Sequence, residues 1–255
     1  MRKILVTGAG GFVGARILDQ WRGRYELCTF PHGFSADSDE AAVRALIARE
    51  KPDVIVHTAA LSNTAYCASH PEESLRANVL LPEWIAKAAA ETGAKLLAFS
   101  SDQVYAGCKR SGPLPETLSL SPANVYGCHK LEAEQRVLAI NPDAVLLRAA
   151  WMYDFPGYRL PIRGNLPLNL LSAAKTGTAL HFSEQDFRGV SYVREVIDKL
   201  IPAMELPGGV YNFGSGNDCD MFETVSRFAQ FLGVEVPLEK DHWERNLAMS
   251  GEKLK

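Results

Sequence analysis

Tyr126 and Lys130 are the side chains of this sequence best suited to moving a proton. They open a predicted helix as Tyr-Gly-Cys-His-Lys, and a spacing of four residues puts them on one helical face. A phenol has an ordinary pKa of about 10 and is a slow acid near neutral pH, but an ammonium held beside it favours the phenolate and lowers that pKa. Ser101, at the end of a predicted strand, can hold a substrate oxygen beside the phenol. Together the three side chains can deliver a proton to a carbonyl oxygen.

The first residues of the chain predict a turn that binds a pyrophosphate. Ile4–Val6 is an apolar run typical of a central parallel strand, and Gly8, Gly11 and Gly14 follow at a spacing of three residues. Such glycines turn the chain, let backbone N–H groups approach phosphate oxygens, and let the next helix pack on the strand with its positive end toward the anion. Taken alone, they also fit an ordinary strand-to-helix turn. We expect the dinucleotide contacts to come from Gly8, Gly10, Gly11, Phe12, Val13 and Gly14.

The glycine turn and the proton-transfer set support one another. A Tyr-x-x-x-Lys pair by itself fits any amphipathic helix, but here it follows the fourth predicted strand and comes about two dozen residues after Ser100 and Ser101. A nicotinamide held at the glycines would give hydride to a carbonyl carbon while Tyr126 protonates its oxygen. The combination indicates a reductase.

Alternating strands and helices must position these residues. Helices are expected from Phe12 to Trp21 and over 39–49, 71–92 and 125–140, with Ser38 available to cap the second. Connections between such strands are right-handed crossovers, so the strands must run mostly parallel. We therefore predict an α/β fold with a doubly wound, mostly parallel (Rossmann) sheet and a ligand crevice at the carboxyl ends of its strands. The strands are expected at 4–6, 25–30, 53–58, 95–100 and 144–149.

The regular alternation stops after Ala150. Prolines and glycines make 151–167 largely loop, and helices are expected at 168–175, 193–204 and 221–232 with short strands at 179–182 and 209–213. We predict an NAD(P)-binding domain over 1–150 and a smaller mixed α/β substrate-binding lobe over 151–255, from which some segments return to the first domain.

Composition and charge favour a protein that works on small molecules. The 255 residues are 47% hydrophobic and 22% charged, and the formal net charge is −3 with no block of Lys or Arg. Neither a nucleic-acid partner nor a membrane partner is expected. The expected partners are a small-molecule substrate and a second copy of the chain in a homodimer.

The cysteines favour a reducing compartment. Five of them are scattered without a C-x-x-C pair, which fits neither a disulfide framework nor a zinc ribbon. Cys67 and His70 have a metal-like spacing, but two ligands make no site, and no metal is expected. The apolar run at the start breaks at Gly8, unlike a signal peptide, so the predicted location is the cytoplasm.

Four motifs resemble the dTDP-4-dehydrorhamnose reductase-like (RmlD-like) family of extended short-chain dehydrogenases/reductases. The glycine loop matches at Gly8, Gly11 and Gly14, and Tyr126–Lys130 matches the family's Tyr-Gly-x-x-Lys. Residues 100–105 resemble its Ser-Thr-Asp-x-Val-Phe segment, and 148–153 resemble its Arg-x-x-Trp-x-Tyr segment. The resemblance covers nearly the whole chain and implies reduction of a keto group on a nucleotide-linked sugar.

The resemblance also implies roles for single residues. Ser101 would polarise the substrate carbonyl, Tyr126 would donate the proton, and Lys130 would lower the phenol pKa and bind the nicotinamide ribose. Further cofactor contacts are expected at Thr58, Ala59, Ala60, Asn78 and Ser100, and substrate contacts at Asp102, Gln103, Val104, Trp151 and Arg188. His57 has two open interpretations, a core histidine or a cofactor contact.

Alternatives remain open for the identity of the cofactor and for the reaction. The second strand ends in Thr29-Phe30-Pro31-His32, with no carboxylate for the ribose diol of NADH, so NADPH is weakly favoured over NADH. An epimerase or dehydratase that retains its NAD has the same motifs. A non-catalytic NADP-binding regulatory subunit, similar to that of methionine adenosyltransferase, is the third alternative.

Overall fold

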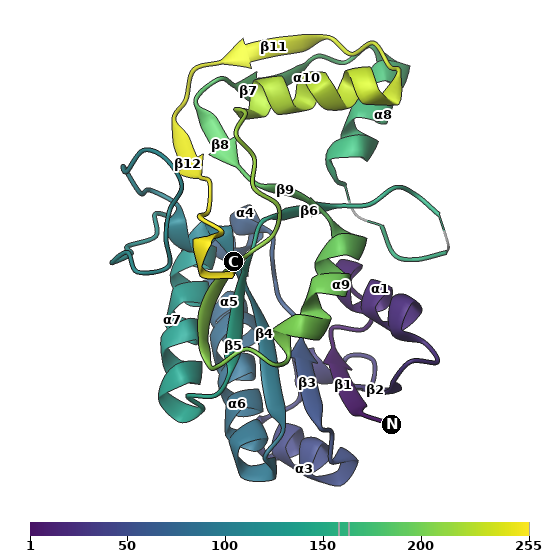
Figure 1. Cartoon of the computed structure of the whole chain (residues 1–255), viewed down its shortest axis with the longest axis vertical. Helices are drawn as coiled ribbons and strands as arrows, with labels where there is room; N and C mark the ends of the chain where they lie inside the picture. The colour runs from purple at the N-terminus through teal and green to yellow at the C-terminus, as the bar shows by residue number, and fades with distance from the viewer. Residues whose placement is uncertain (158, 163, 255) are drawn as a thin grey trace.

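A sheet of six parallel strands forms the centre of the molecule, in the order β10-β5-β4-β3-β1-β2 (Figure 1). The computed structural model describes residues 1–157, 159–162 and 164–254. The predicted doubly wound parallel sheet is thereby confirmed. Its strands are β1 (Lys3–Thr7), β2 (Glu26–Thr29), β3 (Val54–His57), β4 (Lys95–Ser101), β5 (Val145–Ala149) and β10 (Gly209–Phe213).

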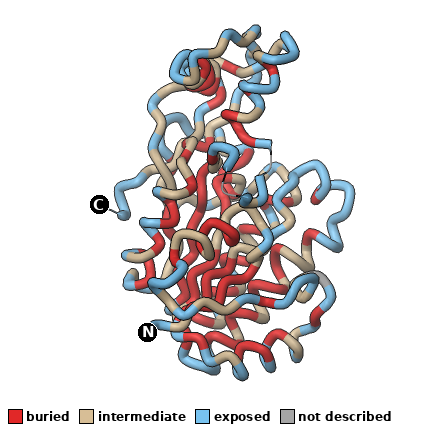
Figure 2. The backbone as a smooth tube through the Cα atoms, turned by 90° about the vertical axis from the view of Figure 1, so that its right-hand side faces the viewer, coloured by how far each residue is buried: buried red, intermediate tan, exposed pale blue. Residues whose placement is uncertain are grey.

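Helices cover both faces of this sheet, because successive side chains of a strand point to opposite sides. Ile4 and Val6 pack on the face covered by α1 (Phe12–Trp21) and α9 (Val193–Ala203). Leu5, between them, packs on the opposite face. Figure 2 shows the buried backbone concentrated in these central strands. The second face is covered by α3 (Glu40–Glu50), α6 (Leu81–Thr92) and α7 (Val125–Ile140).

Two segments from the second half of the sequence lie with the sheet. β10 pairs with β5 in register from Gly209–Val145 to Phe213–Ala149. α9 packs against α1 and contributes Val193, Val196 and Ile197 to the same apolar core. The segments expected at 193–204 and 209–213 therefore extend the sheet and its helical layer. The division of the chain near residue 150, with such returning segments, stays a proposal.

The rest of the second half forms a smaller lobe over the carboxyl ends of the sheet strands (Figure 1). Its core contains Leu166, Leu170, Met221 and Val225. Two short parallel pairs complete it, β7 with β11 and β8 with β12. The lobe elements are α8 (Leu166–Thr176), β7 (Leu180–Ser183), β8 (Asp186–Arg188), α10 (Met221–Leu232), β11 (Leu238–Asp241) and β12 (Arg245–Leu247).

Three local predictions need correction. Part of the segment expected as loop is β6 (Trp151–Tyr153), which pairs with β9 (Val190–Tyr192), a partner too distant in sequence for local composition to reveal. Asp39 caps α3, because its carboxylate accepts from Ala42 N; Ser38 does not. The helix expected over 71–92 is interrupted by five residues of wider π-helical turn. Its parts are α5 (Pro71–Leu75), η1 (Arg76–Leu80) and α6.

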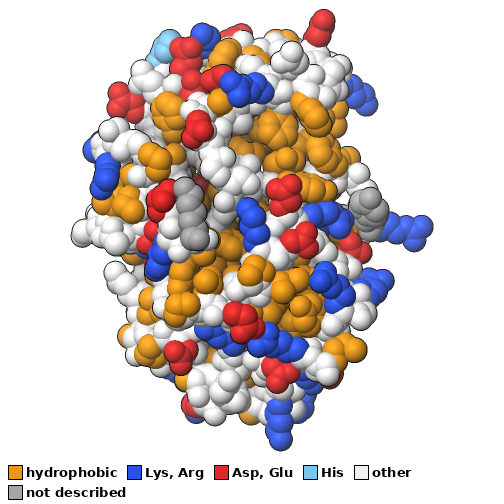
Figure 3. All heavy atoms as spheres, viewed as in Figure 1, with side chains coloured by type: hydrophobic (Ala, Val, Ile, Leu, Met, Phe, Trp, Pro, Cys, Tyr) orange, Lys and Arg blue, Asp and Glu red, His pale blue; other side chains and the backbone are white. Residues whose placement is uncertain are grey.

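Short helices complete the described chain. They are α2 (Phe34–Asp37), α4 (Thr64–Ser69), η2 (Asp102–Tyr105) and η3 (Glu252–Leu254). Within the described residues, every helix is too short or too polar to traverse a bilayer. Figure 3 shows Lys and Arg interspersed with Asp and Glu on one face of the molecule, in keeping with the small net charge.

Candidate active site

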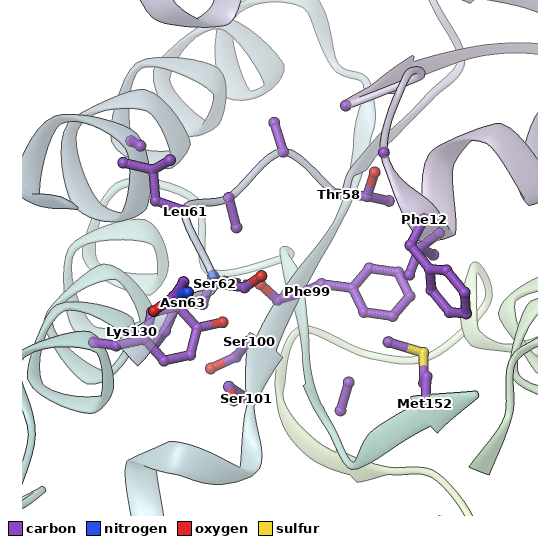
Figure 4. Close-up of a pocket in the computed structure, with 18 of the residues that line it drawn as sticks. Phe12, Thr58, Leu61, Ser62, Asn63, Phe99, Ser100, Ser101, Lys130 and Met152 are labelled. Atoms are coloured by element: carbon purple, nitrogen blue, oxygen red, sulfur yellow. Dashed lines mark hydrogen bonds between the residues drawn. The ribbon is translucent and has the colours of Figure 1, made fainter. Parts of the chain in front are cut away.

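A cleft of about 1050 Å³ lies where β1, β3 and β4 end beneath the lobe. Figure 4 shows side chains converging on it from several elements, among them Phe12 of α1, Thr58 after β3, Phe99 of β4, Lys130 of α7 and Met152 of β6. This is the edge at which a parallel α/β sheet binds ligands. The predicted crevice is therefore present and lined by both halves of the chain.

The glycine loop forms one end of the cleft and has the geometry of a phosphate cradle. Gly8 has φ +68°, and a Cβ there would come within 2.7 Å of Ala59 N. A Cβ at Gly14 would collide with the carbonyl of Gly8, so this glycine sets the close approach of α1 to the loop. Gly10 is open, with nothing near its Cβ position. α1 begins after Gly11 without a side-chain cap, so its first N–H groups are available to an anion.

Ser101, Tyr126 and Lys130 meet in this cleft, although they come from different elements. Ser101 ends β4, whereas Tyr126 and Lys130 lie on the first turns of α7. All three line the cleft and are at most 8% exposed. Asn124 caps α7 by accepting from Gly127 N at 2.8 Å. A Cβ on Gly127 would strike the Gln103 carbonyl, so a glycine is needed for α7 to approach this close to the end of β4.

The Tyr126 phenol is strongly biased toward its neutral, proton-carrying form. Burial raises its pKa most, the negative charge of Asp102 raises it further, and a hydrogen bond with the Ser101 side chain lowers it. Lys130 Nζ donates to the Phe99 carbonyl at 2.6 Å. The expected lowering of the phenol pKa by Lys130 thus stays a prediction, since burial dominates the phenol in this structure.

Lys130 is a buried cation with a distant counter-ion. Burial lowers its pKa to about 8, and the Glu134 carboxylate partly opposes that shift. Glu134, one turn along α7, is itself held by Arg148, with Nη2 to Oε2 at 2.7 Å, and by Ser100 Oγ at 2.5 Å. The lysine therefore lies between the cleft and a buried polar network.

An ion pair in the wall of the cleft links the lobe to the end of the sheet. Arg188 Nη2 of β8 donates to Asp102 Oδ2 at 2.6 Å, and the guanidinium lies 5.2 Å from the centre of the Trp151 ring. Asp102 also accepts from Ser101 Oγ at 3.2 Å. These residues and Gln103 line the cleft as expected, whereas Val104 is 1% exposed and packs in a separate apolar cluster.

The predicted cofactor contacts divide into two groups. Thr58, Ala59 and Ala60 line the cleft next to the glycine loop. The other predicted contacts that line it are Gly8, Gly10, Gly11, Phe12, Val13 and Ser100. Gly14 and Asn78 do not line it. Asn78 is 1% exposed and holds the strand-end loop, donating to the Leu61 carbonyl at 2.9 Å and accepting from Leu61 N at 3.1 Å. Its effect on a cofactor would act through that loop.

Some cleft residues have no signal in the sequence. Arg76 lines the cleft from η1, donates to the Ser38 carbonyl, and lies over the Trp84 ring. Arg245 of β12 also lines it and pairs with Asp186 at 2.6 Å. Nothing in local spacing indicates either residue, because folding alone brings η1 and β12 to the cleft. Among the described residues, no group of three or more His, Cys, Asp or Glu side chains is arranged to hold a metal ion.

Comparison with known proteins gives consistent matches. Residues 1–240 match the family model described as the RmlD substrate binding domain. The dTDP-4-dehydrorhamnose reductase of Mycolicibacterium smegmatis is 35% identical over 60% of the chain and 46% of that protein. Methionine adenosyltransferase 2 subunit beta of Xenopus laevis is 37% identical over 60% of the chain and 47% of that protein. The matched region thus spans about half the length of these two relatives.

A solved structure shares the fold across nearly the whole chain. The dTDP-4-dehydrorhamnose reductase of Bacillus anthracis in complex with NADP superimposes with a TM-score of 0.85 at 20% identity. The match covers 98% of this chain and 87% of that one.

Proposed function

Because the chain belongs to the RmlD substrate binding domain family, we propose that it is an NAD(P)H-dependent reductase of a keto group on a nucleotide-linked sugar. The observation that carries the proposal is the meeting of Ser101, Tyr126 and Lys130 in one cleft beside the glycine loop. The similarity to a dTDP-4-dehydrorhamnose reductase supports the substrate class.

The glycine loop fits the pyrophosphate of a dinucleotide, since Gly10 is open and the start of α1 is uncapped. A bound nicotinamide supplies the hydride. Ser101 holds the carbonyl oxygen of the substrate beside the Tyr126 hydroxyl. Tyr126, neutral because its pKa is raised, gives that oxygen its proton. Lys130 provides the positive charge that favours the phenolate left behind.

Tyr126→Phe tests this assignment. We expect kcat to fall by at least about 100-fold, because the general acid is removed while the ring is retained. The measurement is NAD(P)H consumption with dTDP-4-keto-6-deoxy sugars, alongside cofactor binding to confirm an intact cleft. A Tyr126→Phe variant with wild-type turnover would refute the role of the phenol.

We propose that NADPH is preferred over NADH. The described residues that line the cleft after β2 are Phe30, Pro31, His32, Gly33 and Ser35, without a carboxylate for a ribose diol. The guanidinium of Arg76 reaches the same β2–α3 connection, where it donates to the Ser38 carbonyl. A cation at this end of the cleft suits the 2′-phosphate of NADPH.

Binding of cofactor fragments tests the preference without any substrate. Arg76→Gln should weaken binding of 2′,5′-ADP about tenfold and leave that of 5′-ADP unchanged, because only the former carries the 2′-phosphate. Arg44→Gln is the control, since Arg44 is an exposed arginine of α3 that pairs with Glu91. Equal affinities of the wild type for the two fragments would favour NADH or use of both cofactors.

A non-catalytic cofactor-binding subunit is the second candidate, supported by the 37% identity to methionine adenosyltransferase 2 subunit beta. It predicts that the protein binds NADPH without consuming it and co-purifies with a larger enzyme. An epimerase or dehydratase would instead retain NAD through purification. Steady NADPH consumption by a cofactor-free preparation would exclude both alternatives.

We further propose the cytoplasm as the location of the protein, since all five cysteines are free thiols. A homodimer stays a prediction.

A further inference from the structure

A small internal cavity lies behind Lys130, on the side away from the main cleft. Its wall includes His57 of β3, Ser100 of β4, and Lys130 and Glu134 of α7. The room for the centre of a water molecule is about 10 Å³. That volume accommodates about one water. The rest of the wall is apolar, so these four polar residues supply its side-chain hydrogen-bonding groups.

Hydrogen bonds around Thr7 fix the tautomer of His57. Thr7 Oγ1 accepts from Thr58 N at 3.2 Å and from Ala59 N at 3.4 Å, which uses both of its lone pairs. Its single proton must then be donated to His57 Nδ1, 2.7 Å away. Burial and the nearby Lys130 charge lower the pKa of His57 to about 3, so the ring is neutral and carries its proton on Nε2.

The Nε2–H of His57 is a buried donor in need of an acceptor. The residue is 1% exposed, and Nε2 has no hydrogen-bond partner among the described protein groups. An unsatisfied buried donor costs about 1–3 kcal/mol of desolvation energy, and such groups are commonly satisfied by ordered water. Since Nδ1 is committed to Thr7, the cavity is where the partner of Nε2 must lie.

The remaining wall offers the other partners that a water molecule requires. Lys130 Nζ has three protons and gives one to the Phe99 carbonyl, so two remain for other acceptors. The Glu134 carboxylate accepts from Ser100 Oγ and from Nε and Nη2 of Arg148, and the Nε proton is shared between its two oxygens at 3.0 and 3.3 Å. Three protons therefore serve about four acceptor positions, which leaves capacity for one donor from water. A water in the cavity would accept from His57 and Lys130 and donate to Glu134.

We infer that His57 is a positioning residue for Lys130, holding one water molecule that bridges the Lys130 ammonium to the Glu134 carboxylate. The catalytic consequence rests on the proposed reductase function; the water and the charge of Lys130 do not. The charged or titratable groups that face Lys130 are His57, Glu134 with its partner Arg148, and Tyr126. The charge of Glu134 already opposes the effect of burial on Lys130 through space, and the water bridge would add a hydrogen-bonded route to that attraction.

Two substitutions separate this role from simple packing. His57→Phe fills the space of the ring without a donor, whereas His57→Gln carries an N–H about as far from the backbone as Nε2. Both lose the bond to the Thr7 hydroxyl, so a difference between them reports the cavity donor. Thermal unfolding of both variants shows whether each is folded.

The first measurements need no substrate. A high-resolution crystal structure should show ordered water between His57 and Lys130 in the wild type and in His57→Gln, and none in His57→Phe. NMR titration of lysine Cε resonances should give a lower Lys130 pKa in His57→Phe than in the other two. A wild-type cavity without water, or equal Lys130 pKa values in all three proteins, would overturn the inference.

The kinetic readout connects the water to catalysis. His57→Phe should lower kcat about tenfold and shift the pH profile of kcat, with KM little changed. His57→Gln should restore most of the kcat value and most of its pH profile. A purely structural role would instead lower thermal stability in both variants and leave the pH profile in place. If the wild type reduced no keto sugar, the proposed function would be wrong. The crystallographic water and the measured pKa of Lys130 would still test the inference about His57.

Discussion

At the scale of single residues, the site combines a phenol whose pKa is raised with a lysine whose pKa is lowered. Burial is the largest cause of both shifts, raising the pKa of Tyr126 and lowering that of Lys130. A sequence shows only that the two side chains share a helical face. The structure adds that each has lost most of its contact with water, which is why nearby hydrogen bonds and charges act strongly on them.

Lys130→Met should alter the pH dependence of stability. The folded pKa of Lys130, about 8, lies below the ordinary 10.5, so between these values the unfolded chain binds more protons than the folded one. The free energy of unfolding of the wild type therefore rises with pH between these two values. The cost of burying the charged lysine is fully present below pH 8. Lys130→Met does not carry this cost. The free energy of unfolding of the variant, relative to that of the wild type, should therefore fall by about 3 kcal/mol from below pH 8 to above pH 10.5.

Urea unfolding at a series of pH values measures this difference. Lys87→Met is the control, because Lys87 of α6 is only partly buried and pairs with Glu40 and Glu83. Parallel curves for wild type and Lys130→Met would mean that Lys130 titrates normally in the folded protein.

At the scale of elements, α7 determines where the Tyr126 phenol lies relative to Ser101. Its first turn is fixed by the Asn124 cap and by the approach of Gly127 to the Gln103 carbonyl. The tight contact holds α7 against η2, the turn that follows Ser101. Helix and strand end are thereby held as one unit.

Gly127→Ala tests this contact. The added methyl would overlap the Gln103 carbonyl, so α7 must shift away from η2, at an expected cost of about 2 kcal/mol in stability. We also expect kcat to fall more than about tenfold, since a small displacement separates Tyr126 from the substrate carbonyl. Cys128→Ala, at an exposed position on the same turn, should leave both unchanged. Wild-type activity in Gly127→Ala would show that α7 tolerates displacement.

At the scale of the whole molecule, buried ion pairs join segments far apart in sequence. Arg188 of the lobe meets Asp102 at the end of β4, and Arg16 of α1 meets Asp154 at 2.6 Å. Both carboxylates are nearly inaccessible to solvent, so each depends on its arginine. The Arg188 pair also fixes one wall of the cleft.

Arg188→Met should destabilise the protein by about 3 kcal/mol, because it leaves the buried Asp102 charge without a partner. Asp102→Asn in the same chain should recover part of that loss. The double-mutant cycle, measured by urea unfolding, should give a coupling above about 1 kcal/mol. Strictly additive effects would mean that the pair does not contribute to joining lobe and sheet.

Periodicity and turn chemistry made most of the sheet predictable. Four of its six strands, β1, β3, β4 and β5, contain buried apolar runs typical of central strands. β6 escaped prediction because its partner β9 lies nearly forty residues on, and the π-helical turn at Arg76–Leu80 because it depends on packing. Asn78 was expected at the cofactor and Val104 at the substrate, but neither lines the cleft. Spacing in the sequence does not give the direction of a side chain.

The sequence by itself determined the parallel sheet and the glycine loop and predicted Ser101, Tyr126 and Lys130 as the candidates for proton transfer, because these depend on local pattern and residue chemistry. Only the tertiary structure decided that Arg188 pairs with Asp102, that Arg76 reaches the β2–α3 connection, and that His57 and Lys130 line one small cavity. Each of these contacts joins segments distant in sequence, so it arises from the packing of the whole chain.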